Sequence, residues 1–210
     1  MSLLENVKIN KKDYKVNDIN FYDKVYQKRQ IVLGNTFSNN MNHYIGWMCR
    51  QGGDYKRTAP YTIDKYGEIF EHFDPQYYSD FTNVKVADKH IIPVLLENEG
   101  YLISDIKKGN TFYDYLGREY KGGEIITKKW RTHEYWVPYT NEQLESAVNL
   151  VKYLLGEFDI EPNVVGHNTK FDDIYNYNGV CYRSNYNKIY TDINPTWDFN
   201  KFKEKINNDD

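Results

Sequence analysis

The stretch "IVLGNT", residues 31–36, decides how this chain is interpreted. Its first three residues form a continuous apolar run, which is typical of a β-strand buried on both faces at the centre of a sheet. The run stops abruptly at Gly34 and Asn35, and the polar stretch "FSNNMNH" follows. A central strand therefore delivers a glycine and an asparagine to the edge of the sheet, where binding and catalytic residues often lie.

The composition is that of a folded, aromatic-rich protein. The chain has 210 residues, which suits one domain with elaborated loops. Hydrophobic residues make up 40% and charged residues 27%, so the chain can form a core. It contains 21 Tyr, 10 Phe and 4 Trp. Such side chains suit carbohydrate or peptide grooves and protein interfaces, although a biased genome composition explains them equally well.

Several classes of function are disfavoured by charge and hydropathy. The net charge is -3 and no run of Lys and Arg forms a basic stripe, so we expect no nucleic-acid partner. We also expect no signal peptide and no membrane insertion, because no apolar segment has the required length. Cys49 and Cys181 do not imply a disulfide framework, and we expect two free, buried thiols in a reducing compartment.

Apolar patterns predict strands alternating with helices. A hairpin is expected where "PYTID" and "EIFEHF" flank a turn at Gly67. A buried strand is expected in "HIIPVLL", with Pro93 indicating an edge position or a bulge. A further strand is expected in "DIEPNVVGHNT". Helices are expected in "HYIGWMCRQGG", after Thr140, and in the tail after Pro195. Thr140 and Gln143 form a capping box at the start of the second of these helices.

This order of elements predicts an α/β fold with a central mixed β-sheet flanked by helices. Residues 1–27 are interpreted as an N-terminal lead-in, and residues 28–210 as one domain. Residues 104–138 are polar, aromatic and Gly-rich, so we expect an inserted loop with small strands that decorates the surface. Its aromatic residues suit a glycan groove, and an oligomer or virion interface equally well.

The pieces occur in an order that resembles the zinc-dependent N-acetylmuramoyl-L-alanine amidases. The resemblance is strongest to the phage-encoded branch, whose fold is shared with peptidoglycan recognition proteins, and it covers roughly residues 28–203. It implies an amidase-like fold and peptidoglycan as a partner. The matching pieces are "IVLGNT", "YTIDKYGEIFEHFDPQYY", "IIPVLLENEGYL", "YTNEQLESAVNLVKYLL" and "NYNKIYTDINPTWDF".

In that family, two His and a third Asp or Cys hold a zinc ion that keeps one position open for water. The first ligand ends a strand resembling "IVLHHT", so the resemblance assigns Gly34 to the ligand position and Asn35 to its neighbour. Glycine has no donor atom. The second ligand has two alternative registers, at His167 in "VVGH" or at Arg183 in "NGVCYRSNYN". The Arg183 register then continues without gaps into "YTDINP", and an arginine there would repel a dication.

The remaining family positions are divided between kept and replaced residues. Asp192 in "YTDINP" matches the third ligand. The lysine that steadies the oxyanion in the family is replaced by Tyr190, with Lys188 as a candidate substitute two residues earlier. The catalytic tyrosine of some relatives falls near Ala59 and is absent.

One ligand of three, or two at best, does not form a competent zinc site. The resemblance therefore implies a pseudoenzyme with no cofactor: a phage protein, in the virion or the host cytoplasm, that binds peptidoglycan or other phage structural proteins. An oligomer is compatible with this interpretation. The alternative is an active endolysin-like or tail-associated amidase with a non-standard zinc site, built from His43 or His167 with Asp192, and catalysis by Tyr190 and Lys188. A third option is an unrelated partner on the inherited scaffold.

Each candidate also has a purely structural explanation. His167 suits a hydrogen-bonded histidine at a strand end, Asp192 a turn cap, and His43 a helix surface. Cys181 is either a soft zinc ligand or a small buried residue. Glu97 and Glu99 could offer a general base, but two carboxylates at a strand end are expected to be ordinary solvated residues. No role is assigned to His72 and His90, which are expected at strand ends, or to His133 in the inserted loop.

Overall fold

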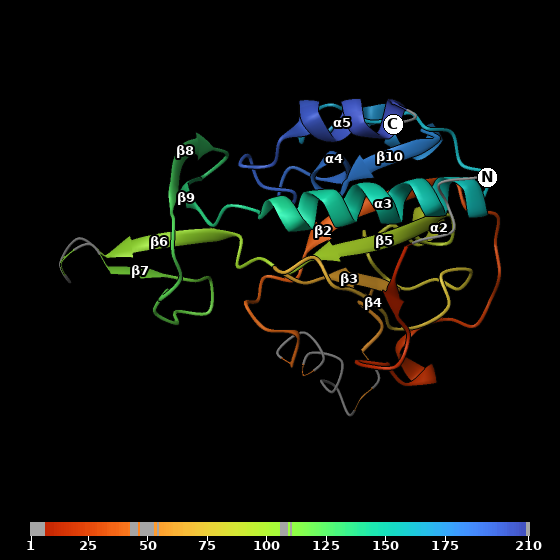
Figure 1. Ribbon diagram of the computed structural model, residues 1–210, viewed down its shortest axis with the longest axis horizontal. Helices are drawn as coiled ribbons and strands as arrows, with labels where there is room; N and C mark the ends of the chain where they lie inside the picture. The colour runs from red at the N-terminus through yellow and green to blue at the C-terminus, as the bar shows by residue number, and fades with distance from the viewer. Residues whose placement is uncertain are drawn as a thin grey trace.

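The computed structural model describes residues 7–42, 46, 53, 55–105, 109 and 111–208. Their main sheet has six strands in the order β1-β4-β3-β5-β2-β10 (Figure 1). Only β3 and β4 run antiparallel, and the other four pairs are parallel, so the predicted mixed sheet is confirmed. The strands are β1 (Ile9–Asn10), β2 (Gln30–Asn35), β3 (Tyr61–Ile63), β4 (Ile69–Glu71), β5 (Ile91–Leu96) and β10 (Gly179–Tyr182).

Strand β2 lies inside the sheet, as the apolar run predicts. It pairs with β5 on one side and β10 on the other, and all six of its residues are buried. The three strands are parallel, with Leu33 opposite Tyr182 and Asn35 opposite Leu96. Their carboxyl ends therefore open at the same edge of the sheet.

Helix α3 (Asn141–Glu157) crosses one face of the sheet, with α5 (Phe199–Asn207) nearby (Figure 1). The predicted capping box is confirmed: Gln143 N donates to Thr140 Oγ1 at 3.1 Å, and Thr140 N to Gln143 Oε1 at 3.2 Å. No helix within the described ranges is both long and apolar enough to cross a membrane. The shorter helices are α2 (Lys85–Asp88), α4 (Arg183–Tyr186) and the 3-10 segments η2 (Asp18–Asn20) and η5 (Asp172–Asn176).

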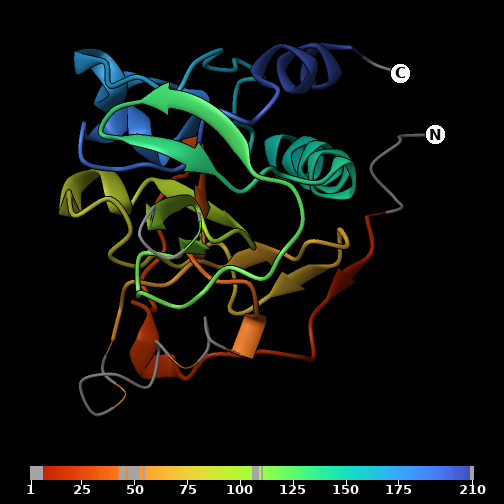
Figure 2. The same ribbon diagram turned by 90° about the vertical axis from the view of Figure 1, so that its left-hand side faces the viewer.

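A second, antiparallel sheet projects beyond the carboxyl end of β5 (Figure 1). It contains the small strands expected between residues 104 and 138. Viewed from that side, the hairpin of its last two strands lies beside the C-terminal segment that carries α4 (Figure 2). The strands, in the order β7-β6-β9-β8, are β6 (Tyr101–Asp105), β7 (Thr111–Tyr113), β8 (Ile126–Trp130) and β9 (His133–Trp136).

The N-terminal segment is fastened to the main sheet. Strand β1 pairs with β4, and the buried imidazole of His72 follows β4 directly. His72 Nδ1 lies 2.7 Å from the carbonyl of Tyr14, and Nε2 lies 2.7 Å from Thr62 Oγ1. The division into a lead-in at 1–27 and a domain at 28–210 stays a prediction.

The edge position or bulge predicted from Pro93 is wrong. Strand β5 lies between β3 and β2, and its register with β2 is unbroken from Ile91 to Leu96. A proline removes only one N–H donor from the ladder. Burial of all six residues of β5 outweighs that loss.

The strand predicted in "DIEPNVVGHNT" is also wrong. Of that stretch only Val164 pairs, through an isolated bridge to Val180. Its polar, Pro-containing start at 161–163 is exposed, whereas Gly179–Tyr182, where no strand was predicted, is buried throughout and forms β10. The C-terminal helix begins at Phe199, because Asp198 supplies the side-chain cap that Pro195 lacks. The helix predicted in "HYIGWMCRQGG" lies outside the described residues, apart from Gly46 and Gly53.

We expect His72 to make stability depend on pH. Burial lowers its pKa from 6.5 to about 4, so the unfolded chain binds its proton first as the pH falls. The contribution is complete above pH 6.5 and shrinks as the pH falls to about 4, by up to about 3 kcal/mol. Urea unfolding across this range measures it. His72→Gln should remove this slope, and an unchanged slope in that variant would contradict the assignment.

Candidate functional site

Four positions selected from the sequence meet at the carboxyl end of β2: Gly34, Asn35, Arg183 and Asp192. Arg183 follows β10 directly, and Tyr182 lies opposite Leu33, so Arg183 leaves the sheet beside Gly34. The chain then returns, and Ser184 N donates to the backbone carbonyl of Asp192 at 2.7 Å. Parallel pairing and this single turn thus place residues about 160 positions apart in contact.

The Asp192 carboxylate fills the space beside Gly34. It has no exposed surface, and its Oδ2 accepts a hydrogen bond of 3.1 Å from Asn35 N. A Cβ atom at position 34 would lie only 2.7 Å from that oxygen and 3.0 Å from the ring of Phe81. Any side chain at position 34 would therefore displace the carboxylate, so glycine is needed here for space.

The guanidinium of Arg183 covers the same carboxylate. Its Nη1 lies 3.6 Å from Asp192 Oδ2, and the side chain is only 16% exposed. The guanidinium carbon is 4.2 Å from the ring centre of Tyr190 and 4.9 Å from that of Phe81. Nε donates to the carbonyl of Phe81 at 3.2 Å. Ring contacts, a hydrogen bond and an ion pair together hold this cation in one place.

Burial dominates the electrostatics of the pair. It raises the pKa of the Asp192 carboxyl, while Arg183 and the amide of Asn35 act in the opposite direction. Asp192 Oδ1 and Asn35 Nδ2 are buried and have no hydrogen-bond partner within the described part of the chain. Burial of the charged carboxylate is thus unfavourable in free energy, and Arg183 is the cation that offsets this cost.

A hydrogen-bonded chain ties Asn35 to two other segments. Tyr139 donates its hydroxyl to Asn35 Oδ1 at 2.6 Å and accepts from Asn194 N at 3.1 Å. Burial raises the pKa of Tyr139, so its hydroxyl stays protonated. Asn194 Nδ2 in turn donates to the carbonyl of Val137 at 3.0 Å. Asn35 therefore has a structural role in holding the C-terminal loop against β2.

Tyr190 is fixed beneath Arg183, whereas Lys188 is exposed. The Tyr190 hydroxyl donates to the carbonyl of Thr82 at 3.0 Å and accepts from Asn83 Nδ2 at 2.6 Å. With its hydroxyl so engaged, Tyr190 presents a ring face to the guanidinium. Catalytic roles for Tyr190 and Lys188 stay predictions.

Arg131 was not selected from the sequence, yet it fixes the loop that carries these residues. It lies in the turn between β8 and β9, with a left-handed φ of 54°. Its guanidinium donates to five backbone carbonyls, and burial lowers its pKa. No motif marks Arg131, because its partners are carbonyls that any sequence supplies. They belong to Asn168 at 3.4 Å, Ser184 at 3.1 Å, Asn187 at 3.1 Å, Lys188 at 2.5 Å, and Tyr190.

A hollow of about 280 Å³ opens directly over the ion pair. Its walls combine side chains from the loop after β2, from the second sheet and from the C-terminal loop. Phe37 and Tyr115 meet edge to face, with ring centres 5.8 Å apart. The aromatic wall comprises Phe37, Tyr101 and Tyr115, and the floor Arg183, Tyr190 and Asp192.

The other predicted ligands do not join this cluster. His167 is exposed, and its Nδ1 lies 2.8 Å from Thr169 Oγ1. Cys181 is a buried free cysteine in β10, and burial raises the pKa of its thiol. His43 and Cys49 lie outside the described residues. Within the described ranges, no three His, Cys, Asp or Glu side chains could hold a metal ion together.

The described residues do not fit the zinc ion that the resemblance implies. The resemblance assigns the position of its first ligand to Gly34, which has no donor and is packed against Asp192 Oδ2. Arg183 places a fixed positive charge 3.6 Å from the same oxygen. A dication beside that guanidinium would be repelled.

One expectation about strand-end carboxylates is corrected. Glu97 is only 8% exposed, and burial raises the pKa of both Glu97 and Glu99. They are not ordinary solvated residues, because the second sheet and α3 cover the end of β5: Gln143 Nε2 donates to the carbonyl of Glu97 at 2.8 Å.

Replacing Gly34 with alanine should lower the free energy of unfolding by about 1–3 kcal/mol. The new methyl group would meet the Asp192 carboxylate and the Phe81 ring. Urea denaturation measures the change. Gly123→Ala is the matched control, because a Cβ there meets nothing within 4 Å. Equal stability of the two variants would show that position 34 is not tightly packed.

Arg183→Met should destabilise the protein by about 3 kcal/mol at neutral pH, because Asp192 would be left buried without its cation. Burial raises the pKa of Asp192 in the folded state, so the loss should become smaller as the pH falls and the carboxyl takes up its proton. In an Asp192→Asn background the same substitution should cost much less. Additive effects in this double-mutant cycle would refute the coupling.

Known amidases resemble this chain in sequence pattern and in fold. The N-acetylmuramoyl-L-alanine amidase family matches residues 24–180 of this chain. Among solved structures, the amidase LysC from Clostridium intestinale URNW is 15% identical with a TM-score of 0.56, covering 96% of this chain and 99% of its own. The endolysin amidase LysCS from the same organism is 14% identical with a TM-score of 0.55, covering 95% of each chain.

A third similar structure is that of AmiD from E. coli in complex with an anhydro-N-acetylmuramic acid peptide. It is 11% identical with a TM-score of 0.56, covering 87% of this chain and 59% of its own. No curated protein matches the chain in sequence. The family match spans more than half of the 210 residues and stops before Arg183 and Asp192. The chain therefore belongs to the N-acetylmuramoyl-L-alanine amidase family.

Proposed function

We propose that this protein is an amidase-fold module that binds peptidoglycan without hydrolysing it. The observation that carries the proposal is the Arg183–Asp192 pair. In the register that assigns the second zinc ligand to Arg183 rather than His167, both residues occupy ligand positions of the family. Gly34, assigned to the first ligand position, contributes only space. Zinc-dependent amide hydrolysis needs a metal ion to activate water and polarise the amide, and these residues do not suit one.

Binding is supported by the hollow over the ion pair. Its wall of Phe37, Tyr101 and Tyr115 offers ring faces and edges, which suit the faces of sugar rings. The similar AmiD structure was determined with a muropeptide. We infer that the hollow takes a segment of a peptidoglycan strand, with the partly exposed edge of Arg183 at its base.

The resemblance to the phage-encoded branch supports the proposal that this module acts in a virion or in the host cytoplasm. In either setting a non-catalytic wall binder has a use, because it holds other components at the cell wall. Contacts with other phage structural proteins, and an oligomer, belong to the same proposal.

The alternative is an active amidase with a non-standard zinc site. It would need His43, which lies outside the described residues, together with Asp192 and a further donor. His167 is exposed and engaged with Thr169, so it does not favour this alternative.

Metal analysis of the purified protein, together with turbidity loss of purified cell walls, separates the two functions. We expect no stoichiometric zinc, no turbidity loss, and co-sedimentation with sacculi. Stoichiometric zinc with EDTA-sensitive lysis would refute the loss of catalysis. Protein that remains in the supernatant would refute the binding role.

Tyr115→Ala should weaken binding to sacculi about fivefold to tenfold, because it removes one wall of the hollow. Tyr66→Ala is the matched control, since Tyr66 is 75% exposed and lies away from the hollow. Sedimentation of both variants over a range of sacculus concentrations measures the effect. Equal affinities would place the binding surface elsewhere.

A further inference from the structure

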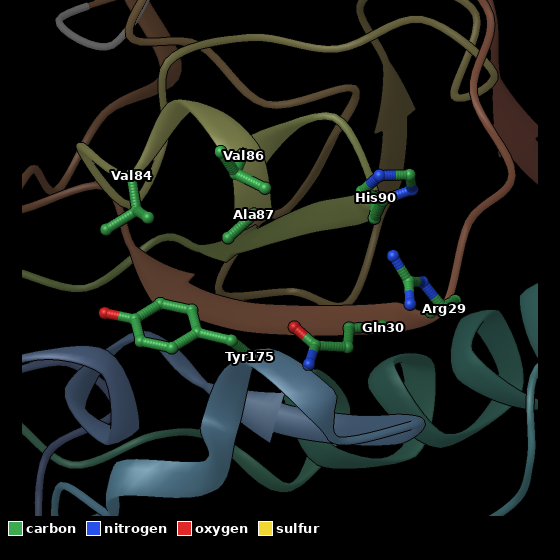
Figure 3. Close-up of a pocket in the computed structure, with 7 residues that line it drawn as sticks. All are labelled: Arg29, Gln30, Val84, Val86, Ala87, His90 and Tyr175. Atoms are coloured by element: carbon green, nitrogen blue, oxygen red, sulfur yellow. The ribbon is translucent and has the colours of Figure 1, made fainter.

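A second hollow lies at the opposite end of β2 from the candidate site. It has a volume of about 280 Å³ and is bounded by the start of β2, by α2 and by η5 (Figure 3). Gln30 and Gly34 are four residues apart along the strand, so the two ends are separated by roughly 13 Å of backbone. Nothing in the proposed function uses this hollow.

The two ends of the hollow differ in chemistry (Figure 3). Arg29 and His90 lie at one end, and Val84 and Tyr175 at the other. None of the described lining residues carries a carboxylate. The hollow is therefore apolar along most of its length and cationic at one end.

The cationic end is held in place by the backbone. Arg29 N donates to the carbonyl of His90 at 2.8 Å, which places the two residues side by side. His90 Nδ1 lies 2.8 Å from the carbonyl of Gln27, so Nε2 remains for another contact. Within the described residues, the Arg29 guanidinium has no hydrogen-bond or ion-pair partner. An unpaired guanidinium beside an apolar wall is suited to a carboxylate.

The apolar end exposes side chains that are usually covered. Val86 is 74% exposed and Tyr175 is 50% exposed. The floor is rigid, because Gln30 Nε2 donates to the carbonyls of Ile174 at 2.6 Å and Tyr177 at 2.7 Å. Because its amide nitrogen is engaged in this way, Gln30 does not offer a hydrogen-bond donor to a ligand in the hollow.

We propose that this hollow binds a small carboxylate with an apolar body. The carboxylate pairs with Arg29, and the body lies against Val84, Val86 and Tyr175. At roughly 30 Å³ for each water in the liquid, the hollow has room for a ligand of about ten non-hydrogen atoms. An uncharged ligand would leave the guanidinium unpaired, and a purely polar anion would leave the apolar wall uncovered.

Titration of the ¹⁵N-labelled full chain with 3-phenylpropionate tests the proposal by NMR. We expect saturable binding in the millimolar range or tighter, with the largest shifts at Gln30, Val86 and His90. 3-Phenylpropanol, which lacks the charge, and propionate, which lacks the ring, should each bind at least about tenfold more weakly. Equal binding of acid and alcohol, or shifts centred on Gly34 and Arg183, would overturn it.

Arg29→Met keeps the length of the side chain and removes its charge, and it should weaken 3-phenylpropionate binding about tenfold or more. Arg57→Met is the matched control, because Arg57 is also exposed and does not line the hollow. Dispersed amide spectra would establish that both variants are folded. Unchanged affinity in Arg29→Met, or an equal loss in Arg57→Met, would contradict the site.

Discussion

The contact between the Asp192 carboxylate and the backbone of β2 is the constraint on which the rest of the site depends. A buried carboxylate needs hydrogen bonds and a compensating cation. Here the amide of Asn35 provides the hydrogen bond, the missing side chain of Gly34 provides the room, and Arg183 provides the charge. Each of these three residues is explained by the demands of a single buried acid.

The surrounding fold makes that arrangement rigid. Parallel pairing of β2 and β10 fixes where Arg183 leaves the sheet. The second sheet contacts the C-terminal segment through Arg131, whose guanidinium donates hydrogen bonds to five of its backbone carbonyls. The inserted aromatic segment is therefore more than surface decoration, because it determines the position of the loop that bears Tyr190 and Asp192.

Much of the framework could be predicted from the sequence, because its signals are local. The apolar run of β2, the hairpin around Gly67 and the capping box at Thr140 each depend on neighbouring residues, and each is present. Strand β10 and the central position of β5 could not be read in this way. They depend on which distant segments compete for the same edge of the sheet, and on burial that outweighs the preference of Pro93.

The candidate site, too, could be predicted from the sequence only in part. Resemblance to the family assigned Gly34, Arg183 and Asp192 to the ligand positions of one metal ion, so they were expected to lie close together, but it did not predict the ion pair between Arg183 and Asp192. The close packing of Asp192 against Gly34, and the five backbone carbonyls that accept hydrogen bonds from Arg131, could not be predicted from a residue pattern, because they depend on backbone positions. We propose that the family fold is kept here while the residues that carry its chemistry are replaced, which is compatible with the general independence of fold and function.

The central claim is that a guanidinium, rather than a metal ion, neutralises Asp192. A crystal structure of the protein grown with excess zinc chloride, with anomalous data collected at the zinc edge, tests it directly. The account predicts Arg183 in contact with Asp192 and no anomalous peak beside that carboxylate. A zinc peak coordinated by Asp192, with Arg183 turned away, would contradict it.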